Sequence, residues 1–137
     1  MCPRRRFYRG PIENVAAGKK ERVLFHKGKI CVRQLNIYCN GDDTTGTYKN
    51  KWIIKVDGEE LVNMNCKDMY KYLVGYIVCQ HANRPVINTI YNDSSKIYAF
   101  IINDLGVVNE GIEVWFENKD TSNSCGIEVG MVYDVLE

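Results

Sequence analysis

The chain has 137 residues, of which 45% are hydrophobic and 26% charged, and its formal net charge at pH 7 is +1. At this length and composition we expect one globular domain that buries roughly two thirds of its unfolded surface. No apolar run approaches the ~20 residues that a membrane-spanning helix needs, and no apolar core follows the N-terminal sequence MCPRRRFYRG. We therefore expect no membrane span and no secretory signal.

The basic charge is concentrated at the N-terminal end. Residues 1–22 hold seven basic and two acidic residues, a balance of +5, whereas the remainder holds 11 basic and 15 acidic residues, a balance of −4. The first twenty residues also contain two prolines and two glycines and show little hydrophobic periodicity. These features predict an extended basic arm over residues 1–20 and a single domain over residues 21–137.

The arm interleaves arginines with aromatic residues, in the order Arg4, Arg5, Arg6, Phe7, Tyr8 and Arg9. Guanidinium groups neutralise phosphates and aromatic rings stack on bases, so the segment suits nucleic acid, although four arginines are too few for tight binding by charge alone. It suits a neighbouring subunit, or a solvated tail, equally well. We leave these three interpretations open.

Strand signals begin directly after the arm. The segments 22–26 and 30–39 flank a turn at Lys27-Gly28-Lys29, which predicts two antiparallel strands. Within the second segment the apolar phase slips near Arg33 and Gln34, and this slip predicts a β-bulge.

A second pair of strands follows the polar loop 40–46. Residues 47–56 place Trp52 on one face together with Ile54 and Val56. The pair Asp57-Gly58 then predicts a hairpin turn into a strand over residues 60–64.

One short helix is predicted over Cys66–Gly75. Asn65 is suited to the N-cap, Asp68 lies in the first turn, and Met69 and Leu73 fall at helical spacing.

Residues 86–91 and 96–103 predict another hairpin. Both faces of Ile97–Ile102 are apolar, as in a strand that is covered on each side or buried at an interface.

The C-terminal strands show the clearest alternation. Ile112, Val114 and Phe116 alternate with polar residues and with Trp115 over 111–118, and a second alternating run covers 125–136. With the segments above, these make eight strands. Eight antiparallel strands with one short helix midway favour an all-β fold, an eight-stranded jelly-roll sandwich with an extended N-terminal arm.

Residues that could perform chemistry are sparse. The chain has two histidines, His26 and His81. His81 could ligate a metal ion together with Cys79, but no second pair of ligands completes the site. The carboxylates fall mostly in turns, where Asp is favoured because it hydrogen-bonds to the backbone. No phosphate-binding or hydrolase motif is present. We therefore predict no catalytic residues, no metal and no cofactor.

The six cysteines form no CxxC pair, which removes the commonest zinc and redox signatures. Cys31 and Cys39 would share one strand face unless a bulge intervenes, and they are too far apart to bond. We favour reduced thiols in a cytosol, with a disulfide-bearing particle outside the cell as the alternative.

The two tryptophans are the candidate platform residues. Trp115 is out of phase with its apolar neighbours and should face away from the core, where a Trp anchors an interface or stacks on a sugar. We favour the interface. A glycan platform formed by Trp52 or Trp115 is the alternative.

Three parts of the chain resemble single jelly-roll proteins of viral particles, which include small capsid, vertex, turret and fibre-head subunits: VAAGKKERVLF running into KICVRQLNIYC, WIIKVDGEEL, and GIEVWFENKD. The resemblance implies a virion protein that assembles in the host cytoplasm. Its partners would be copies of itself and other virion proteins, with nucleic acid at the arm and glycan as further partners. The expected function is structural and non-enzymatic.

Overall fold

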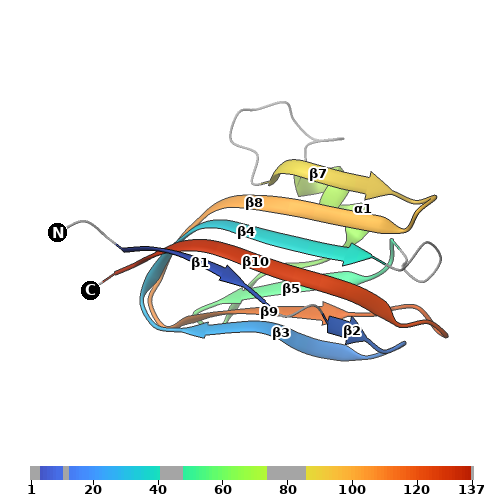
Figure 1. Ribbon diagram of the computed structural model, residues 1–137, viewed down its shortest axis with the longest axis horizontal. Helices are drawn as coiled ribbons and strands as arrows, with labels where there is room; N and C mark the ends of the chain where they lie inside the picture. The colour runs from blue at the N-terminus through green and yellow to red at the C-terminus, as the bar shows by residue number, and fades with distance from the viewer. Residues whose placement is uncertain (1–3, 11–12, 41–47, 74–85, 137) are drawn as a thin grey trace.

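The computed structural model describes residues 4–10, 13–40, 48–73 and 86–136, which fold into two antiparallel β-sheets facing each other (Figure 1). We name each sheet after one of its inner strands. The β10 sheet contains, in spatial order, β1 (Arg4–Arg9), β10 (Cys125–Val135), β4 (Ile30–Asn40), β8 (Ile97–Val108) and β7 (Val86–Asn92), with β2 (Glu13–Val15) also paired to β10. The β9 sheet contains β3 (Lys20–Lys27), β9 (Gly111–Glu117), β5 (Lys51–Val56) and β6 (Glu59–Asn65).

The core lies between the inner faces of the two sheets, because alternate residues of each strand point inward. On β9 the inward residues are Ile112, Val114 and Phe116, all fully buried. On β10 the inward residues include Ile127 and Val129. The predicted all-β, antiparallel, two-layered architecture with one short helix is therefore confirmed.

The helical segment begins as predicted at a capped residue. Asn65 accepts a hydrogen bond of 2.7 Å from the backbone N–H of Asp68, and α1 spans Cys66–Asp68. The segment then widens into one π-helical turn, η1 (Met69–Leu73). The rest of the predicted helix, residues 74–75, lies outside the described residues, as do Cys79 and His81.

All eight predicted strands are present with shifted ends; β8, for example, continues to Val108. The described residues form ten strands, and the two additional strands, β1 and β2, both fall within the predicted arm. The predicted bulge is confirmed by a register shift between Val32 and Gln34. As a result Cys31 is only half-buried while Cys39 lies in the core.

The arm residues described here pair with almost the full length of β10. β1 pairs residue by residue from Arg4 opposite Val135 to Arg9 opposite Gly130, and β2 continues the ladder towards Cys125. Gly10 keeps the two pieces attached, since its N–H donates to the Val129 carbonyl over 2.8 Å. A Cβ at this glycine would lie only 3.1 Å from that oxygen, which explains why a residue without a side chain fits here.

Candidate functional site

Two exposed surfaces, on opposite faces of the sandwich, contain most of the residues singled out by the sequence. We call the first surface the arm strand, which is β1 (Arg4–Arg9). All six of its residues are exposed, and Phe7 is 79% exposed. Phe7 lies opposite Val132, whose neighbour Met131 points into the core. Because directly opposed residues of an antiparallel pair project to the same side, Phe7 points outward from the β10 sheet.

A buried carboxylate fixes the arm strand at its start. Asp134 is 3% exposed and accepts hydrogen bonds from the guanidinium groups of Arg5, at 2.9 Å, and Arg33, at 2.7 Å. The pKa of Asp134 is lowered to about 2, most strongly by the hydrogen bond from Arg5 and next by that from Arg33. A second, exposed ion pair joins Arg9 to Glu128 over 3.1 Å.

The remaining arginines of the arm strand have no such partner. Within the described part of the chain, neither Arg4 nor Arg6 forms an ion pair, and Arg6 donates only to the carbonyl of Arg5 at 3.4 Å. Ladder hydrogen bonds and two ion pairs thus hold the strand, while two guanidinium groups and the Phe7 ring remain available to a partner.

The second surface, the Trp115 face, is the outer side of the β9 sheet. Trp115 is half-buried and lies between Arg22 on β3 and Ile53 on β5. The cationic groups of Lys20, Arg22 and Lys55 lie 5.6, 6.0 and 5.8 Å from its ring. These distances are near the outer limit for cation–π attraction, so each contact is weak. The outward orientation of Trp115 agrees with the alternation seen in the sequence.

Trp52 does not belong to this surface. It is fully buried and packs edge-to-face against Phe116, with the ring centroids 4.7 Å apart. A ligand therefore has no access to it, and its place among the platform residues is corrected to a place in the core. It shares the inward phase of β5 with Ile54, which is also fully buried.

Phe25 is an exposed aromatic residue that the sequence patterns did not single out. It is 51% exposed on the edge strand β3 and lies directly opposite Glu113 of β9. Arg22 joins the two, because its guanidinium lies 4.4 Å from the Phe25 ring and 3.2 Å from the Glu113 carboxylate. A register shift between Arg22 and Leu24 brings Phe25 to the outer face, whereas strict alternation from the buried Val23 would have placed it on the inner face.

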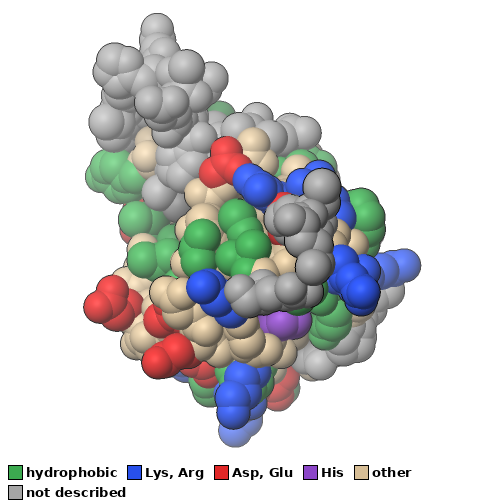
Figure 2. Space-filling view, turned by 90° about the vertical axis from the view of Figure 1, so that its left-hand side faces the viewer, with side chains coloured by type: hydrophobic (Ala, Val, Ile, Leu, Met, Phe, Trp, Pro, Cys, Tyr) green, Lys and Arg blue, Asp and Glu red, His purple; other side chains and the backbone are tan. Residues whose placement is uncertain are grey.

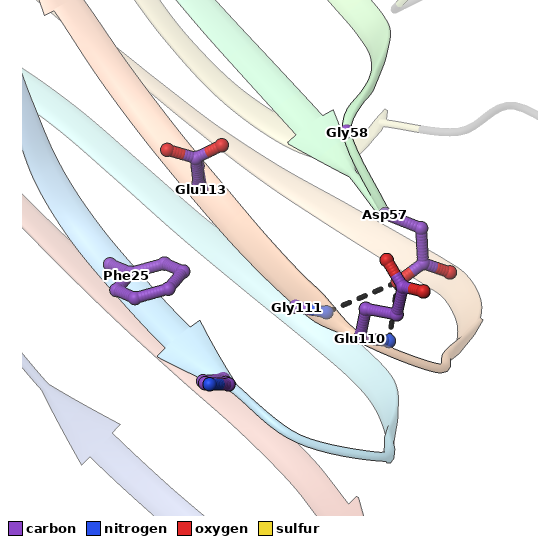
Figure 3. A pocket seen from close by; sticks show the side chains of 7 residues that line it. Phe25, Asp57, Gly58, Glu110, Gly111 and Glu113 are labelled. Atoms are coloured by element: carbon purple, nitrogen blue, oxygen red, sulfur yellow. Dashed lines mark hydrogen bonds between the residues drawn. The ribbon is translucent and has the colours of Figure 1, made fainter.

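A pocket of about 310 Å³ opens beside Phe25 at the end of the sandwich (Figure 3). Its lining comes from the end of β3, the β5–β6 turn and the start of β9, and consists of Phe25, Lys27, Asp57, Gly58, Glu110, Gly111 and Glu113.

Asp57 holds the β8–β9 turn in place at one side of this pocket. Its carboxylate accepts hydrogen bonds from the backbone N–H groups of Asn109, Glu110 and Gly111, the shortest being 2.6 Å to Glu110. These bonds, led by that from Glu110, lower the pKa of Asp57. The Asp57 oxygens are thus occupied by the β8–β9 turn, whereas the Glu110 side chain has no ion pair among the described residues.

The core contains a second group of side chains of a reactive type, a cluster of cysteine thiols. The sulfur atoms of Cys39 and Cys66 lie 3.8 Å apart, and an Asn50 amide nitrogen lies 3.6 Å from the sulfur of Cys125. All four side chains are fully buried. Among the residues that the structure describes, no group of three His, Cys, Asp or Glu side chains is placed to hold a metal ion.

No protein-family model matches the chain, and no curated protein sequence matches it either. No helix in the described ranges is long and apolar enough to cross a membrane.

Proposed function

We propose that this protein is a non-enzymatic assembly subunit, which associates with copies of itself through its exposed strands and its basic arm, as part of a virion. The observation that supports self-association most directly is the position of the exposed apolar side chains. Seven large hydrophobic residues are exposed among the described residues, and five of them lie on edge strands. These five are Phe7 and Tyr8 on β1, Phe25 on β3, Leu61 on β6 and Ile90 on β7.

The four strands β1, β7, β3 and β6 at the ends of the two sheets therefore each present at least one large apolar side chain to solvent. Soluble proteins usually protect such edges with charges, bulges or covering segments, because unpaired strands with apolar side chains invite further pairing. The arrangement fits a protein whose edges are covered by neighbouring subunits.

The strand order supports the finer assignment to the jelly-roll fold. Without β1 and β7, the spatial orders are β2-β10-β4-β8 and β3-β9-β5-β6. Consecutive strands β2 and β3, β4 and β5, and β8 and β9 alternate between sheets, as in a wound double Greek key. This fold is common in virion subunits, as the sequence resemblance implies, and neighbouring virion proteins are the proposed partners beside copies of this chain.

The ion pairs of the arm favour a subunit contact over nucleic acid. Arg5 and Arg9 are paired with carboxylates of the same chain, which leaves Arg4 and Arg6 to neutralise phosphates. Two phosphate contacts give only a shallow dependence of affinity on salt, on the order of −1.4 to −1.8 in logarithmic slope.

A ligand-binding module is the second candidate function, and the pocket beside Phe25 favours it. An exposed aromatic ring next to the carboxylate of Glu110 is a combination that can bind a sugar through stacking and hydrogen bonds. Three cations already lie over Trp115, however, so its ring is less open to a sugar than the ring of Phe25.

Light scattering of the purified protein tests the assembly proposal. We expect the mass of the full chain to rise with concentration above the 15.8 kDa of one copy, and deletion of residues 1–9 to lower it. A single-copy mass for both proteins at the highest soluble concentration would refute self-association. Binding to a glycan panel by that monomer would then favour the ligand-binding module.

A further inference from the structure

We propose that Cys39 and Cys66 are the site of a disulfide bond that joins the two sheets when the protein meets an oxidising environment. Both residues carry thiols in the structure, and their sulfur atoms lie 3.8 Å apart in the core. Cys39 lies near the end of β4 in the β10 sheet, whereas Cys66 directly follows β6 of the β9 sheet. The bond links the two layers through the core, and it does not depend on the proposed assembly function.

The two sulfur atoms need only a small movement to bond. A disulfide has a sulfur–sulfur distance of about 2.0 Å, so the two atoms must approach each other by about 1.8 Å. Rotations about the Cα–Cβ bonds of both residues can share this movement. The two residues belong to different sheets, so no ladder of backbone hydrogen bonds fixes their separation. Disulfides between facing sheets occur in other β-sandwiches, such as antibody domains.

Cys125 is the nearest competitor for Cys39, and the strand register disfavours it. Ile127 lies opposite Cys39 in the ladder between β10 and β4, so Cys125 is only a diagonal neighbour of Cys39. Diagonal neighbours have Cβ atoms nearly 7–8 Å apart, whereas a disulfide needs about 3.5–4.5 Å. The ladder would have to shift to close this gap. Asn50 also donates to the Cys125 sulfur over 3.6 Å.

Cys31 lies too far from Cys39 to compete. It is eight positions earlier on β4, which at about 3.3 Å per residue separates the two by roughly 25 Å. Cys31 lies opposite Asp134, at the end of the sandwich where both termini lie and onto which Figure 2 looks. The thiol cluster lies at the other end, because β10 begins at Cys125. Among the cysteines that the structure describes, Cys66 is therefore the best-placed partner for Cys39.

Burial keeps the pair reduced until the core opens. The hydrogen bond with Cys125 acts to lower the pKa of Cys39, but the hydrogen bond with Cys66 and burial raise it well above its ordinary value. Because the thiolate is the nucleophile in disulfide exchange, the closed core reacts slowly at neutral pH. Opening costs least at Cys66, since β6 is an edge strand and α1 has three residues.

A low-molecular-weight disulfide, such as oxidised glutathione, supplies the oxidant. When the segment opens, the Cys66 thiolate attacks one glutathione sulfur, forms a mixed disulfide and releases the other glutathione as a thiolate. The Cys39 thiolate then attacks the Cys66 sulfur, which forms the bond between the sheets and releases the second glutathione. The protein loses two protons and two electrons, and one oxidised glutathione becomes two reduced molecules.

The bond restricts the unfolded chain. Cys39 and Cys66 are 27 positions apart, and the loop between them contains β5 and β6. From the typical stabilisation by a disulfide, we expect oxidation to raise the melting temperature by roughly 10 °C. The protein would gain this stability only outside a reducing compartment, because glutathione and thioredoxin keep cytosolic thiols reduced.

Oxidation of the folded, unaltered protein tests the proposal. The protein is incubated with oxidised glutathione until the number of free thiols is constant, then alkylated and digested with trypsin without reduction. The lysines and arginines place each of the six cysteines on a different peptide, so mass spectrometry identifies the bonded pair. We expect residues 34–49 joined to 56–67, together with the rise in melting temperature and its reversal by dithiothreitol. A folded protein whose Cys39 stays free or joins Cys125 would overturn the proposal.

Two core variants provide matched controls, each compared with its own reduced form so that the cost of the substitution cancels. Cys125→Ala should still form the bond and gain melting temperature on oxidation, whereas Cys66→Ala should show neither change. Cys31→Ala should behave as the unaltered protein does. A bond that forms in urea but not in buffer would show that the native core does not bring the pair together, which also refutes the proposal. If a core variant does not fold, the peptide map of the unaltered protein decides the question alone.

Discussion

Asn118 is the residue whose removal most clearly tests how the arm is joined to the sandwich. It is fully buried just after β9 and makes three side-chain hydrogen bonds. Its amide nitrogen donates to the carbonyls of Val15 on β2 and of Asn123, each over 2.9 Å, and its oxygen accepts from the N–H of Asp120 at 2.9 Å. One side chain thus connects the end of the arm to the β9–β10 loop.

The substitution Asn118→Ala removes all three bonds and leaves two carbonyls and one N–H without this partner. At about 1 kcal/mol for each hydrogen bond, the free energy of unfolding should fall by about 3 kcal/mol. For a domain of this size that loss corresponds to a decrease of roughly 10 °C in melting temperature.

Urea unfolding followed by tryptophan fluorescence measures this change. Asn109→Ala is a matched control, because Asn109 is exposed and its hydrogen bond to Asp57 is donated by the backbone N–H, which the substitution keeps. The expected change in the free energy of unfolding is within about 0.5 kcal/mol. If Asn118→Ala costs no more than the control, the three bonds do not stabilise the fold and our interpretation of this junction is wrong.

Three further predictions follow from the charges and aromatic residues. The pKa of Asp134 is about 2, below its ordinary value of 3.8, so the stabilisation from its arginine partners is present above about pH 4 and is lost as the pH falls towards 2. The protection of residues 4–9 against hydrogen exchange, taken relative to the intrinsic exchange rate at each pH, should therefore fall over that range, and Asp134→Asn should remove this pH dependence of the protection. Burial, followed by the charge of the nearby Asp93, raises the pKa of Tyr91 to about 12, so ultraviolet titration should find a tyrosine that ionises well above the ordinary value of 10; a titration in which all tyrosines ionise near pH 10 would contradict this. Trp52→Ala should cost roughly 3–5 kcal/mol because it opens a cavity in the core. Trp115→Ala should cost less, since it loses weak cation–π contacts of about 0.5–1 kcal/mol each. Acrylamide should quench Trp115 preferentially, and equal quenching of both tryptophans would refute their assignment to surface and core.

Local sequence patterns were sufficient for the strands that contribute to the core. Along β9, a strand with one buried face must alternate, so the positions of Phe116 and Trp115 on opposite sides followed from the sequence. The phase slip near Gln34 likewise predicted the bulge, and Asn65 predicted the start of the helix. In each case the physical cause lies within a few residues of the signal.

The arm strand could not be predicted in this way. β1 buries none of its side chains, so it has no hydrophobic period to detect, and its conformation depends on the unpaired edge of β10 more than a hundred residues away. The pocket has the same origin, because its walls come from three turns or strand ends that only the folded sheet brings together. Sequence alone also grouped Trp52 with Trp115 as a platform residue, and only the facing of the two sheets decided that Trp52 belongs to the core. Side-chain alternation thus determined the strands, whereas the partners of each edge and the depth of each aromatic residue were decided by contacts between distant segments.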